Sequence, residues 1–526
     1  MTEATLLHQF VAAAALRAPQ RPALTFGHDA ADYATLARDV EGFASGLLQL
    51  GLSRSDRVGI YLDKRIETVV ACFGTAAAGG VFVPLNPLFK PDQVGYIVRD
   101  CNVRVLVTSP ERLTSLAAIL PQCPELRHLV VTGPKAAGRP PGIELADWAS
   151  VRDAPPGPGH RIVDIDMAAI LYTSGSTGKP KGVVLSHRNM VAGAKSVASY
   201  LGNHADDTLL AALPLSFDAG FSQLTTAFHV GARVVLLNYL LPQDVINALS
   251  RERVTGLTAV PPLYIQLTQQ KWPEAIADHL RYFANTGGRM PRETLNALRE
   301  KLPRSRPYLM YGLTEAFRST YLPPEEVDRR PDSIGKAIPN AEILVLREDG
   351  TPCAPDEPGE LVHRGALVAM GYWGDPEKTA ERFRPLPGRE AGLVLPEIAV
   401  FSGDTVRRDA EGFLYFIGRR DEMIKTSGYR VSPTEIEEVL YATTLVGEAA
   451  AFGVPHPTLG QAIGVVATPM PATELDAATL LKECRERLPA YMVPATIDIR
   501  PGPLPRNPNG KIDRKALSAD FQETPS

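Results

Sequence analysis

The chain has 526 residues, enough for two to four domains that bury their own cores without disulfide or metal staples. Hydrophobic residues make up 44% and charged residues 22% of the sequence, which excludes a disordered chain. The net charge is −4, and no run of Lys or Arg marks a basic surface, so nucleic-acid binding is not expected.

The cysteines are too scattered to form a structural framework. There are five, an odd number, and none belongs to a Cys-x-x-Cys motif. A disulfide scaffold or a cysteine zinc site is therefore not expected, and a reducing compartment, the cytoplasm, is predicted. The N-terminus, MTEATLLHQF, lacks the basic stretch that precedes the apolar core of a signal peptide, so no signal peptide is predicted.

The first third of the chain alternates helical and strand patterns. Steps of four, three and four residues predict one apolar helix face, formed by Leu36, Val40, Phe43 and Leu47. Short apolar runs predict strands at residues 57–62, 104–108 and 129–132. Strands separated by helices indicate an α/β arrangement with a largely parallel sheet. Residues 133–160 are rich in Pro and Gly, and we expect a surface excursion there.

Residues 68–89 carry no charge and are long enough to raise the question of a membrane span. Glycines and prolines interrupt this segment, at Gly79, Gly80, Pro84 and Pro87. The segment therefore predicts a buried helix, a tight turn and a buried strand, and no membrane span.

The character of the sequence changes near its last hundred residues. We predict a large domain over residues 1–420 and a small α+β domain over residues 421–526. In the small domain, Ser432 is predicted to cap a helix that starts at Pro433, with Glu435 completing a capping box. The apolar face of this helix is predicted at Ile436, Val439 and Leu440.

A glycine- and hydroxyl-rich loop is the most informative stretch of the sequence. It reads TSGSTGKPKG and lies between a predicted buried strand at residues 168–172 and a second apolar run. Glycines allow backbone N–H groups to converge on a phosphate, hydroxyls add donors, and Lys181 adds charge. The loop is not a Walker A motif, because Pro180 follows Lys179 where that motif needs Ser or Thr. The alternative is a polar hairpin with solvated lysines.

With this loop the chain resembles the adenylate-forming superfamily: acyl- and aryl-CoA synthetases, adenylation domains that load carrier proteins, and firefly luciferase. Further motifs similar to those of the superfamily follow in order: YGLTE at 311–315, GELVHRG at 359–365 with GYW at 371–373, SGD at 402–404, GRRDEMIKTSGYRVSPTEIE at 418–437, and PRNPNGKIDRKAL at 505–517. The hinge motif is most similar to CoA ligases, among them the acyl-CoA ligases associated with exosortase export. The resemblance implies a large N-terminal domain of layered α/β subdomains and a small mobile C-terminal α+β domain.

The resemblance also implies a two-step reaction. A carboxylate attacks ATP to give acyl-AMP and pyrophosphate, and then a thiol of CoA, or of a carrier-protein phosphopantetheine, attacks the acyl-AMP. Catalytic roles are implied for Lys511, Thr314 and Glu315, with Glu315 also holding Mg²⁺. Asp421 would be the hinge, and Gly428 would line the thiol channel. The implied ATP-binding residues are Thr173, Ser174, Gly175, Ser176, Thr177, Gly178, Lys181, Gly287, Tyr311, Asp404 and Arg419. Taken singly, each could be an ordinary turn residue or solvated charge.

The implied acid pocket departs from fatty acyl-CoA synthetases, which carry an aromatic-His pair where this chain has Phe217-Asp218. That dipeptide resembles amino-acid-activating domains, in which the Asp pairs with the substrate ammonium. The other implied pocket residues are Ala219, Ser222, Thr258, Asn285, Met310, Arg318 and Ser319. This set is polar, and a long acyl chain would leave its polar groups without partners, whereas Arg318 could meet a second carboxylate. The alternative is that Asp218 caps a helix and Arg318 points to solvent.

Three functions stay open. The first is an AMP-forming acyl-CoA ligase for a small polar or amino-bearing acid. The second is a stand-alone amino-acid adenylating enzyme that loads a carrier protein, and the third is a non-catalytic adenylate-binding protein of the same fold. Retention of Lys511, Glu315 and Asp404 argues against the third, because binding alone would not need Lys511. The expected partners are a small acid and either CoA or a carrier protein.

Overall fold

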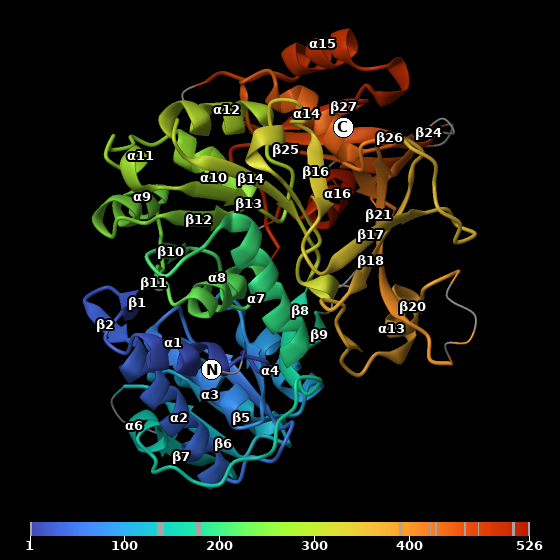
Figure 1. The fold of residues 1–526 in the computed structure, drawn as a ribbon. Helices are drawn as coiled ribbons and strands as arrows, with labels where there is room; N and C mark the ends of the chain where they lie inside the picture. The colour runs from blue at the N-terminus through green and yellow to red at the C-terminus, as the bar shows by residue number, and fades with distance from the viewer. Residues whose placement is uncertain are drawn as a thin grey trace.

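The computed structural model describes residues 3–133, 141–173, 180–388, 392, 394–420, 422–426, 429–456, 459–471, 473–507 and 511–523. Within these residues the chain forms three β-sheets with helices packed on and between them (Figure 1). A large N-terminal part is followed by a small C-terminal part, which confirms the predicted α/β fold class. Predicted site residues Ser174, Gly175, Ser176, Thr177, Gly178, Asp421 and Gly428 lie outside the described residues.

The first sheet lies in the N-terminal half, drawn in blue at the bottom of Figure 1. In the described part of the chain its eight strands run in the order β19 (Gly371–Tyr372), β9 (Lys181–Ser186), β8 (Met167–Thr173), β4 (Val81–Pro84), β3 (Arg57–Tyr61), β5 (Val103–Thr108), β6 (His128–Val131) and β7 (Glu144–Asp147). The pairs from β8 through β7 are parallel, which confirms the predicted strands and their direction.

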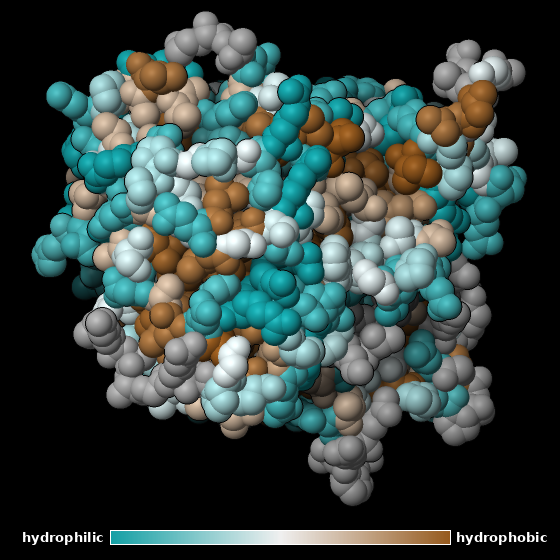
Figure 2. Space-filling view, turned by 90° about the horizontal axis from the view of Figure 1, so that it is seen from below, coloured by the Kyte–Doolittle hydropathy of each residue, from teal (hydrophilic) through white to brown (hydrophobic). Residues whose placement is uncertain are grey.

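The predicted helix and the uncharged segment both have the expected structure. The four apolar residues of the helix pattern lie on α2 (Tyr33–Gln49) and are buried. The uncharged segment forms α3 (Ile66–Ala77), a turn and β4, all buried. No helix in the described residues is long and apolar enough to cross a membrane. On the face seen in Figure 2, hydrophobic residues form patches separated by hydrophilic ones.

The expected surface excursion at residues 133–160 is partly wrong. Residues 141–160 are described, and they contain β7 and a short helix, α6 (Trp148–Arg152). The indole of Trp148 packs on Phe43 of α2, with ring centroids 4.8 Å apart. Trp148 and Val151 are both buried against α2 and hold the segment at the edge of the sheet, and composition alone does not reveal those contacts.

The second sheet has fourteen strands in the described residues. Thirteen run in the order β17 (Ala341–Leu346), β18 (Gly359–Gly365), β21 (Ile398–Arg408), β22 (Leu414–Arg419), β16 (Ser333–Ala337), β15 (Thr320–Leu322), β14 (Arg306–Tyr311), β13 (Tyr282–Asn285), β12 (Gly256–Ala259), β10 (Thr208–Ala211), β11 (Arg233–Leu236), β1 (Pro22–Phe26) and β2 (Asp29–Asp32), and β20 (Phe383–Pro385) pairs with β21. Its parallel centre, β14 through β1, carries the acid pocket described below.

Two helices, α7 (His187–Leu201) and α8 (Asp218–Val230), lie between the two large sheets (Figure 1). Phe221 of α8 packs against Phe73 and Phe82, with ring centroids 5.8 and 4.9 Å apart. The remaining helices are α1 (Gln9–Arg17), α4 (Pro91–Asp100), α5 (Pro110–Leu116), α9 (Pro242–Arg251), α10 (Pro261–Thr268), α11 (Ile276–His279), α12 (Arg292–Lys301), α13 (Pro376–Arg382), α14 (Pro433–Tyr441), α15 (Ala477–Arg487) and α16 (Arg514–Glu523).

The third sheet belongs to the C-terminal part, at the top of Figure 1. Its strands in the described residues are β24 (Tyr429–Val431), β23 (Ile424–Thr426), β26 (Gly460–Pro469), β25 (Val446–His456) and β27 (Thr496–Ile499). Helix α14 starts at Pro433 as predicted, and its face packs on this sheet. The predicted capping box is wrong, because the Ser432 hydroxyl lies 2.7 Å from the hydroxyl of Thr434 and caps no backbone N–H. The domain boundary at residues 420 and 421 stays a prediction.

Candidate active site

Two strand ends and a short helix meet at the phosphate end of the site. Thr173 ends β8 and pairs with Lys181, the first residue of β9, so the two frame the glycine-rich loop. The Lys181 ammonium donates to the Tyr372 hydroxyl at 2.7 Å and lies 3.4 Å from Glu315 Oε1. The Tyr372 hydroxyl in turn donates to Glu315 Oε1 at 2.5 Å. Thr314 is buried beside Glu315 on the short 3₁₀ helix η2 (Thr314–Ala316).

The charges of this cluster are set by their surroundings. Burial lowers the pKa of the Lys181 ammonium, and Glu315 opposes this effect only in part. Burial alone would raise the pKa of Glu315, but Lys181 and the Tyr372 hydroxyl lower it below its ordinary value. Glu315 is therefore an anion at neutral pH, which suits a ligand of Mg²⁺.

Tyr311, at the end of β14, meets Asp404 of β21 and Arg419, at the end of the adjacent strand β22. The Tyr311 hydroxyl donates to Asp404 Oδ2, and Arg419 Nη1 donates to Asp404 Oδ1 at 3.1 Å. Burial raises the pKa of Asp404, and the Arg419 guanidinium opposes this shift. The Ser402 hydroxyl accepts the Asp404 backbone N–H at 3.1 Å, so Ser402 keeps the hydroxyl of the Thr usual in the superfamily. Gly403 has a φ of 71°, which favours glycine at this turn.

Asp218 and Arg318 are ion-paired with each other. Arg318 Nη1 lies 3.3 Å from Asp218 Oδ2, and the two side chains are 2% and 3% exposed. The alternative in which Arg318 points to solvent is therefore wrong. Asp218 is the first residue of α8, and among the described residues its Oδ1 has no hydrogen-bond partner. Burial raises the pKa of the Asp218 carboxyl, while Arg318 lowers it in part.

A strained residue positions Arg318. Phe317, the residue before it, has a φ of 56°, in the left-handed region that phenylalanine rarely adopts. The Phe317 ring is fully buried against Gly193 of α7, where a Cβ would come within 2.4 Å of the ring. Packing therefore holds a strained backbone that turns Arg318 toward Asp218.

Five of the predicted pocket residues line one narrow cavity between α7, α8 and the parallel strands. These are Ala219, Ser222, Thr258, Met310 and Arg318. The cavity measures about 10 Å³, which is close to the smallest space that holds one water molecule. Ser319 instead contacts the buried His363 ring at 2.9 Å, and the Asn285 amide donates to the Gly288 carbonyl at 2.8 Å. Neither of these two residues is among those that line the cavity, and Asp218 reaches it only through its partner Arg318.

Lys511, on the small C-terminal part, lies beside Gly287 of the large part. Its Cε is 3.6 Å from the point where a Cβ of Gly287 would stand, and Gly287 has a φ of 75°. Solvent still reaches the side chain, but the protein around it lowers the pKa of the ammonium by desolvation. The carboxylates of Asp218 and Asp404 oppose this shift in the pKa of Lys511.

One ion pair joins the two parts. Arg289, which follows β13, lies 2.5 Å from Glu438 of α14 and 2.8 Å from Asp332. The Arg289 and Glu438 side chains are 27% and 36% exposed, so the pair is partly hydrated. Gln269 of α10 adds a contact to Met470 Sδ at 3.6 Å.

Sequence reasoning missed two kinds of residue. Tyr372 belongs to the GYW motif, but the motif gave no reason to place its hydroxyl between Lys181 and Glu315. The cavity is also lined by residues that were not predicted: Gln223, Thr226, Gly256 and Tyr282. The helical spacing of Asp218, Ser222 and Thr226 was the available signal, since residues four apart share one face of a helix.

Replacement of Tyr372 by Phe is expected to raise the KM for ATP about tenfold in pyrophosphate exchange. The change removes the hydroxyl that links Lys181 to Glu315, a loss of two hydrogen bonds to charged groups. Tyr33→Phe is the matched control, because that buried hydroxyl donates to the Ala232 carbonyl far from the site. Equal KM values for ATP in the Tyr372→Phe variant and the parent protein would contradict the proposed link.

The chain belongs to the AMP-binding enzyme family. That family matches residues 11–373, and its AMP-binding enzyme C-terminal domain matches residues 435–511. A feruloyl-CoA synthase of Amycolatopsis sp is 31% identical over 507 residues, covering 94% of each chain. An L-proline–[L-prolyl-carrier protein] ligase of Pseudomonas fluorescens is 30% identical over 529 residues, covering 98% of this chain and 99% of the relative.

Solved structures agree with this assignment. The anthranilate CoA ligase AuaEII in complex with anthranoyl-AMP matches with a TM-score of 0.87 and 25% identity, covering 98% of this chain and 97% of that one. Other solved structures of the same fold hold ATP, one of them with a magnesium ion. The resemblance found in the sequence is confirmed, and the protein is an AMP-forming ligase that joins an acid to a thiol.

Proposed function

We propose that the protein is an AMP-forming CoA ligase for a small polar or amino-bearing acid. The observation that carries the proposal is the buried Asp218–Arg318 pair, of which Arg318 lines a cavity of about 10 Å³. A long acyl chain would not fit a cavity of this size, and it would place hydrocarbon against the ion pair. The buried polar atoms of the pair that have no partner would then stay unpaired. A compact acid with its own polar group would supply those partners.

The residues of the site suit the two half-reactions. Lys181 and the loop before it would hold the β- and γ-phosphates, Thr314 would contact the α-phosphate, and Asp404 would accept the ribose hydroxyls. Lys511 would offset the charge that develops as the acid attacks phosphorus. Magnesium, held by Glu315 with phosphate oxygens and water, would supply further charge neutralisation.

CoA is the acceptor that we favour, because the hinge motif is most similar to CoA ligases and a feruloyl-CoA synthase is a relative. Transfer to a carrier-protein phosphopantetheine is the second candidate, favoured by the prolyl-carrier protein ligase. Both thiols would enter past Gly428 after the small domain turns about Asp421. We place the reaction in the cytoplasm, where ATP and CoA are available.

Pyrophosphate exchange across amino acids, hydroxy acids, aryl acids and fatty acids tests the proposal. Thioester formation with the best acid is then measured with CoA and with phosphopantetheinylated carrier proteins. Exchange driven best by long fatty acids would contradict the proposed acid class. Transfer to a carrier protein with none to CoA would establish the second candidate.

An amino acid is expected to drive exchange about a hundredfold better than its deamino analogue. Asp218 Oδ1 is buried and has no partner in the described part of the chain, so a substrate ammonium would satisfy it. The comparison uses each amino acid and its deamino analogue at equal concentration, with Asp218→Asn as the variant that should erase the difference. Equal exchange with both members of every pair would reject ammonium recognition by Asp218.

A further inference from the structure

Helix α8 is buried on every side but is not apolar on every side. All residues from Asp218 to Phe228 are buried, and five of them are polar: Asp218, Ser222, Gln223, Thr225 and Thr226. A buried polar side chain costs free energy unless a hydrogen bond satisfies it. Each polar residue on this helix therefore calls for a partner.

Two of these side chains keep polar atoms without a partner and line the acid pocket. Gln223 Nε2 donates to the carbonyls of Leu210 at 2.8 Å and Thr258 at 3.4 Å, which fixes the amide and leaves Oε1 as a free acceptor. Among the described residues neither Gln223 Oε1 nor Thr226 Oγ1 has a hydrogen-bond partner. The two side chains are 5% and 2% exposed. Thr225 differs, since its hydroxyl donates to the Ser222 carbonyl at 3.2 Å.

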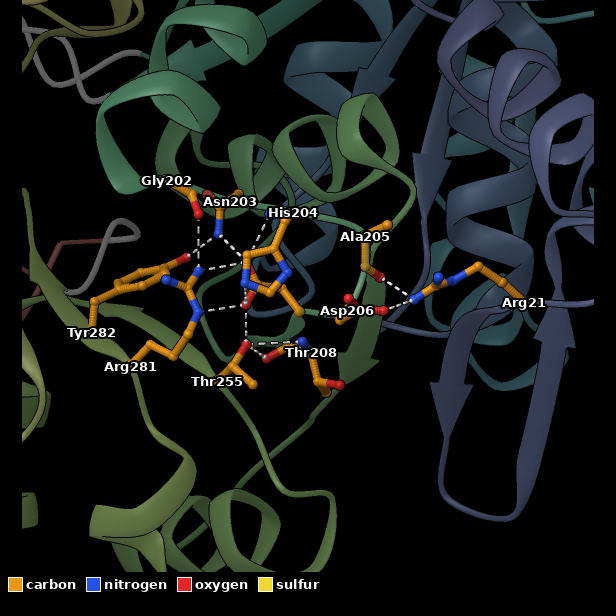
Figure 3. Close-up of polar contacts among 11 residues, drawn as sticks. Arg21, Gly202, Asn203, His204, Ala205, Asp206, Thr208, Thr255, Arg281 and Tyr282 are labelled. Carbon is orange, nitrogen blue, oxygen red and sulfur yellow. Dashed lines mark hydrogen bonds and ion pairs between the residues drawn. The ribbon is translucent and has the colours of Figure 1, made fainter.

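One end of the pocket, its floor, is formed by residues whose positions are fixed by their contacts. Leu209, Gly256 and Tyr282 line this end, and a Cβ at residue 256 would come within 2.4 Å of the Tyr282 ring. Figure 3 shows the Tyr282 hydroxyl pointing to the amide of Asn203, from which it accepts a hydrogen bond at 3.1 Å. The Tyr282 ring therefore lies against Gly256, and the hydrogen bond from Asn203 holds its hydroxyl.

A buried ion pair fixes that floor in turn. The Asn203 amide also donates to Asp207 Oδ2 at 3.0 Å, and the guanidinium of Arg281 contacts both oxygens of Asp207 at 2.8 and 2.6 Å. Asp207 is 1% exposed, and its pKa is lowered because Arg281 and its neighbours outweigh the effect of burial. A bidentate pair of this kind holds Tyr282 through Asn203.

We infer that the acid carries a hydroxyl group at the end remote from its carboxylate, and that Gln223 and Thr226 bind this hydroxyl above Tyr282. A hydroxyl donates one hydrogen bond, which Gln223 Oε1 needs, and accepts another, which Thr226 can supply. The cavity of about 10 Å³ admits one group of this size. Thr226 lies roughly 12 Å along α8 from Asp218, at 1.5 Å per residue. Asp218 and Thr226 would therefore bind different ends of the acid. This inference rests on the proposed function.

The test measures kcat/KM in pyrophosphate exchange with acids that differ only in a terminal hydroxyl. The pairs are butyrate with 4-hydroxybutyrate, 2-aminobutyrate with homoserine, and benzoate with 4-hydroxybenzoate. We expect the hydroxy acid to be preferred at least about tenfold in one pair or more, because a deoxy acid leaves both buried atoms unpaired. Preference for the deoxy member, or equality in all pairs, would overturn the inference while leaving the proposed function in place.

Variants assign the preference to the residues named. Thr226→Val keeps the shape of the side chain and should reduce the preference about tenfold, whereas Thr226→Ser should restore it. Thr225→Val is the matched control on the same helix and should keep the preference. Equal losses with both members of a pair in Thr226→Val would show a purely structural role, with water as the occupant of the cavity, and would overturn the inference. The inference would also be overturned if none of these acids drove exchange while other acids did.

Discussion

Replacement of Lys511 by Ala is expected to reduce pyrophosphate exchange about a thousandfold and to leave the conversion of supplied acyl-AMP to thioester intact. Lys511 lies beside Gly287, and the carboxylates of Asp218 and Asp404 raise the pKa of its ammonium in part. A cation there stabilises charge only while the carboxylate attacks ATP, so its removal should affect one half-reaction. Lys482→Ala, a change at an exposed lysine of α15, serves as the control.

The pH dependence of exchange gives a second readout for Lys511. Burial lowers the pKa of this ammonium below its ordinary value of 10.5, so the active cation is lost as the pH rises through the lowered pKa. Exchange should therefore fall at a pH where an ordinary lysine is still charged. Lys511→Arg should remove this alkaline limb, since arginine stays protonated. An alkaline limb that persists unchanged in Lys511→Arg would assign it to another group.

The reverse pattern is expected at Gly428, which stays a prediction because it lies outside the described residues. A Trp at this position should keep exchange and block thioester formation, since a bulky side chain would obstruct the thiol channel. If the variants at Lys511 and Gly428 stay folded and both lose both half-reactions equally, alternation of the small domain between two poses is wrong for this protein.

Replacement of Arg318 by Met is expected to lower the free energy of unfolding by about 3–5 kcal/mol. The change leaves the Asp218 carboxylate buried without its partner, which costs more than the intact pair contributes. The double variant Asp218→Asn/Arg318→Met should recover most of the loss, because it removes both charges together. Denaturant unfolding of the three variants measures the difference, and equal losses in the single and double variants would contradict the ion-pair account.

The sign of the pH effect provides a check on the same variant. Burial already raises the pKa of Asp218 in the parent protein, and the loss of Arg318 should raise it further. A raised pKa means that the folded state binds more protons than the unfolded state in the window above the ordinary value of 3.8. The destabilisation of Arg318→Met should therefore be largest above the raised pKa and shrink as the pH falls through it.

The fold was predictable from local patterns. The spacing on α2, the apolar runs of β3, β5 and β6, and the interrupted segment of α3 and β4 each carry their structure within a few residues. The capping box at Ser432 and the excursion at residues 133–160 went wrong for different reasons. The Ser432 hydroxyl meets the hydroxyl of Thr434, two residues on, in place of a backbone N–H. The excursion went wrong because packing of Trp148 on α2, a tertiary contact that one sequence does not show, overrode the local composition.

The sequence predicted which residues form the site better than it predicted which of them pair with each other. The motifs named Lys181, Glu315, Asp404 and Lys511, and the structure places Lys181 beside Glu315 and Lys511 beside Gly287. They did not reveal that Arg318 pairs with Asp218, because the two are a hundred residues apart and meet only through the strained turn at Phe317. The floor at Tyr282 was missed because it depends on the space left by Gly256.

The partly hydrated bridge from Arg289 to Glu438 makes ionic strength a control on turnover. An ion pair that water reaches contributes little free energy and is weakened by salt. If the small domain alternates as predicted, release of this pair would add little to the barrier, and the pair would favour the pose described here. Moderate salt should therefore shorten the interval between adenylate formation and thioester formation, without changing any reacting group.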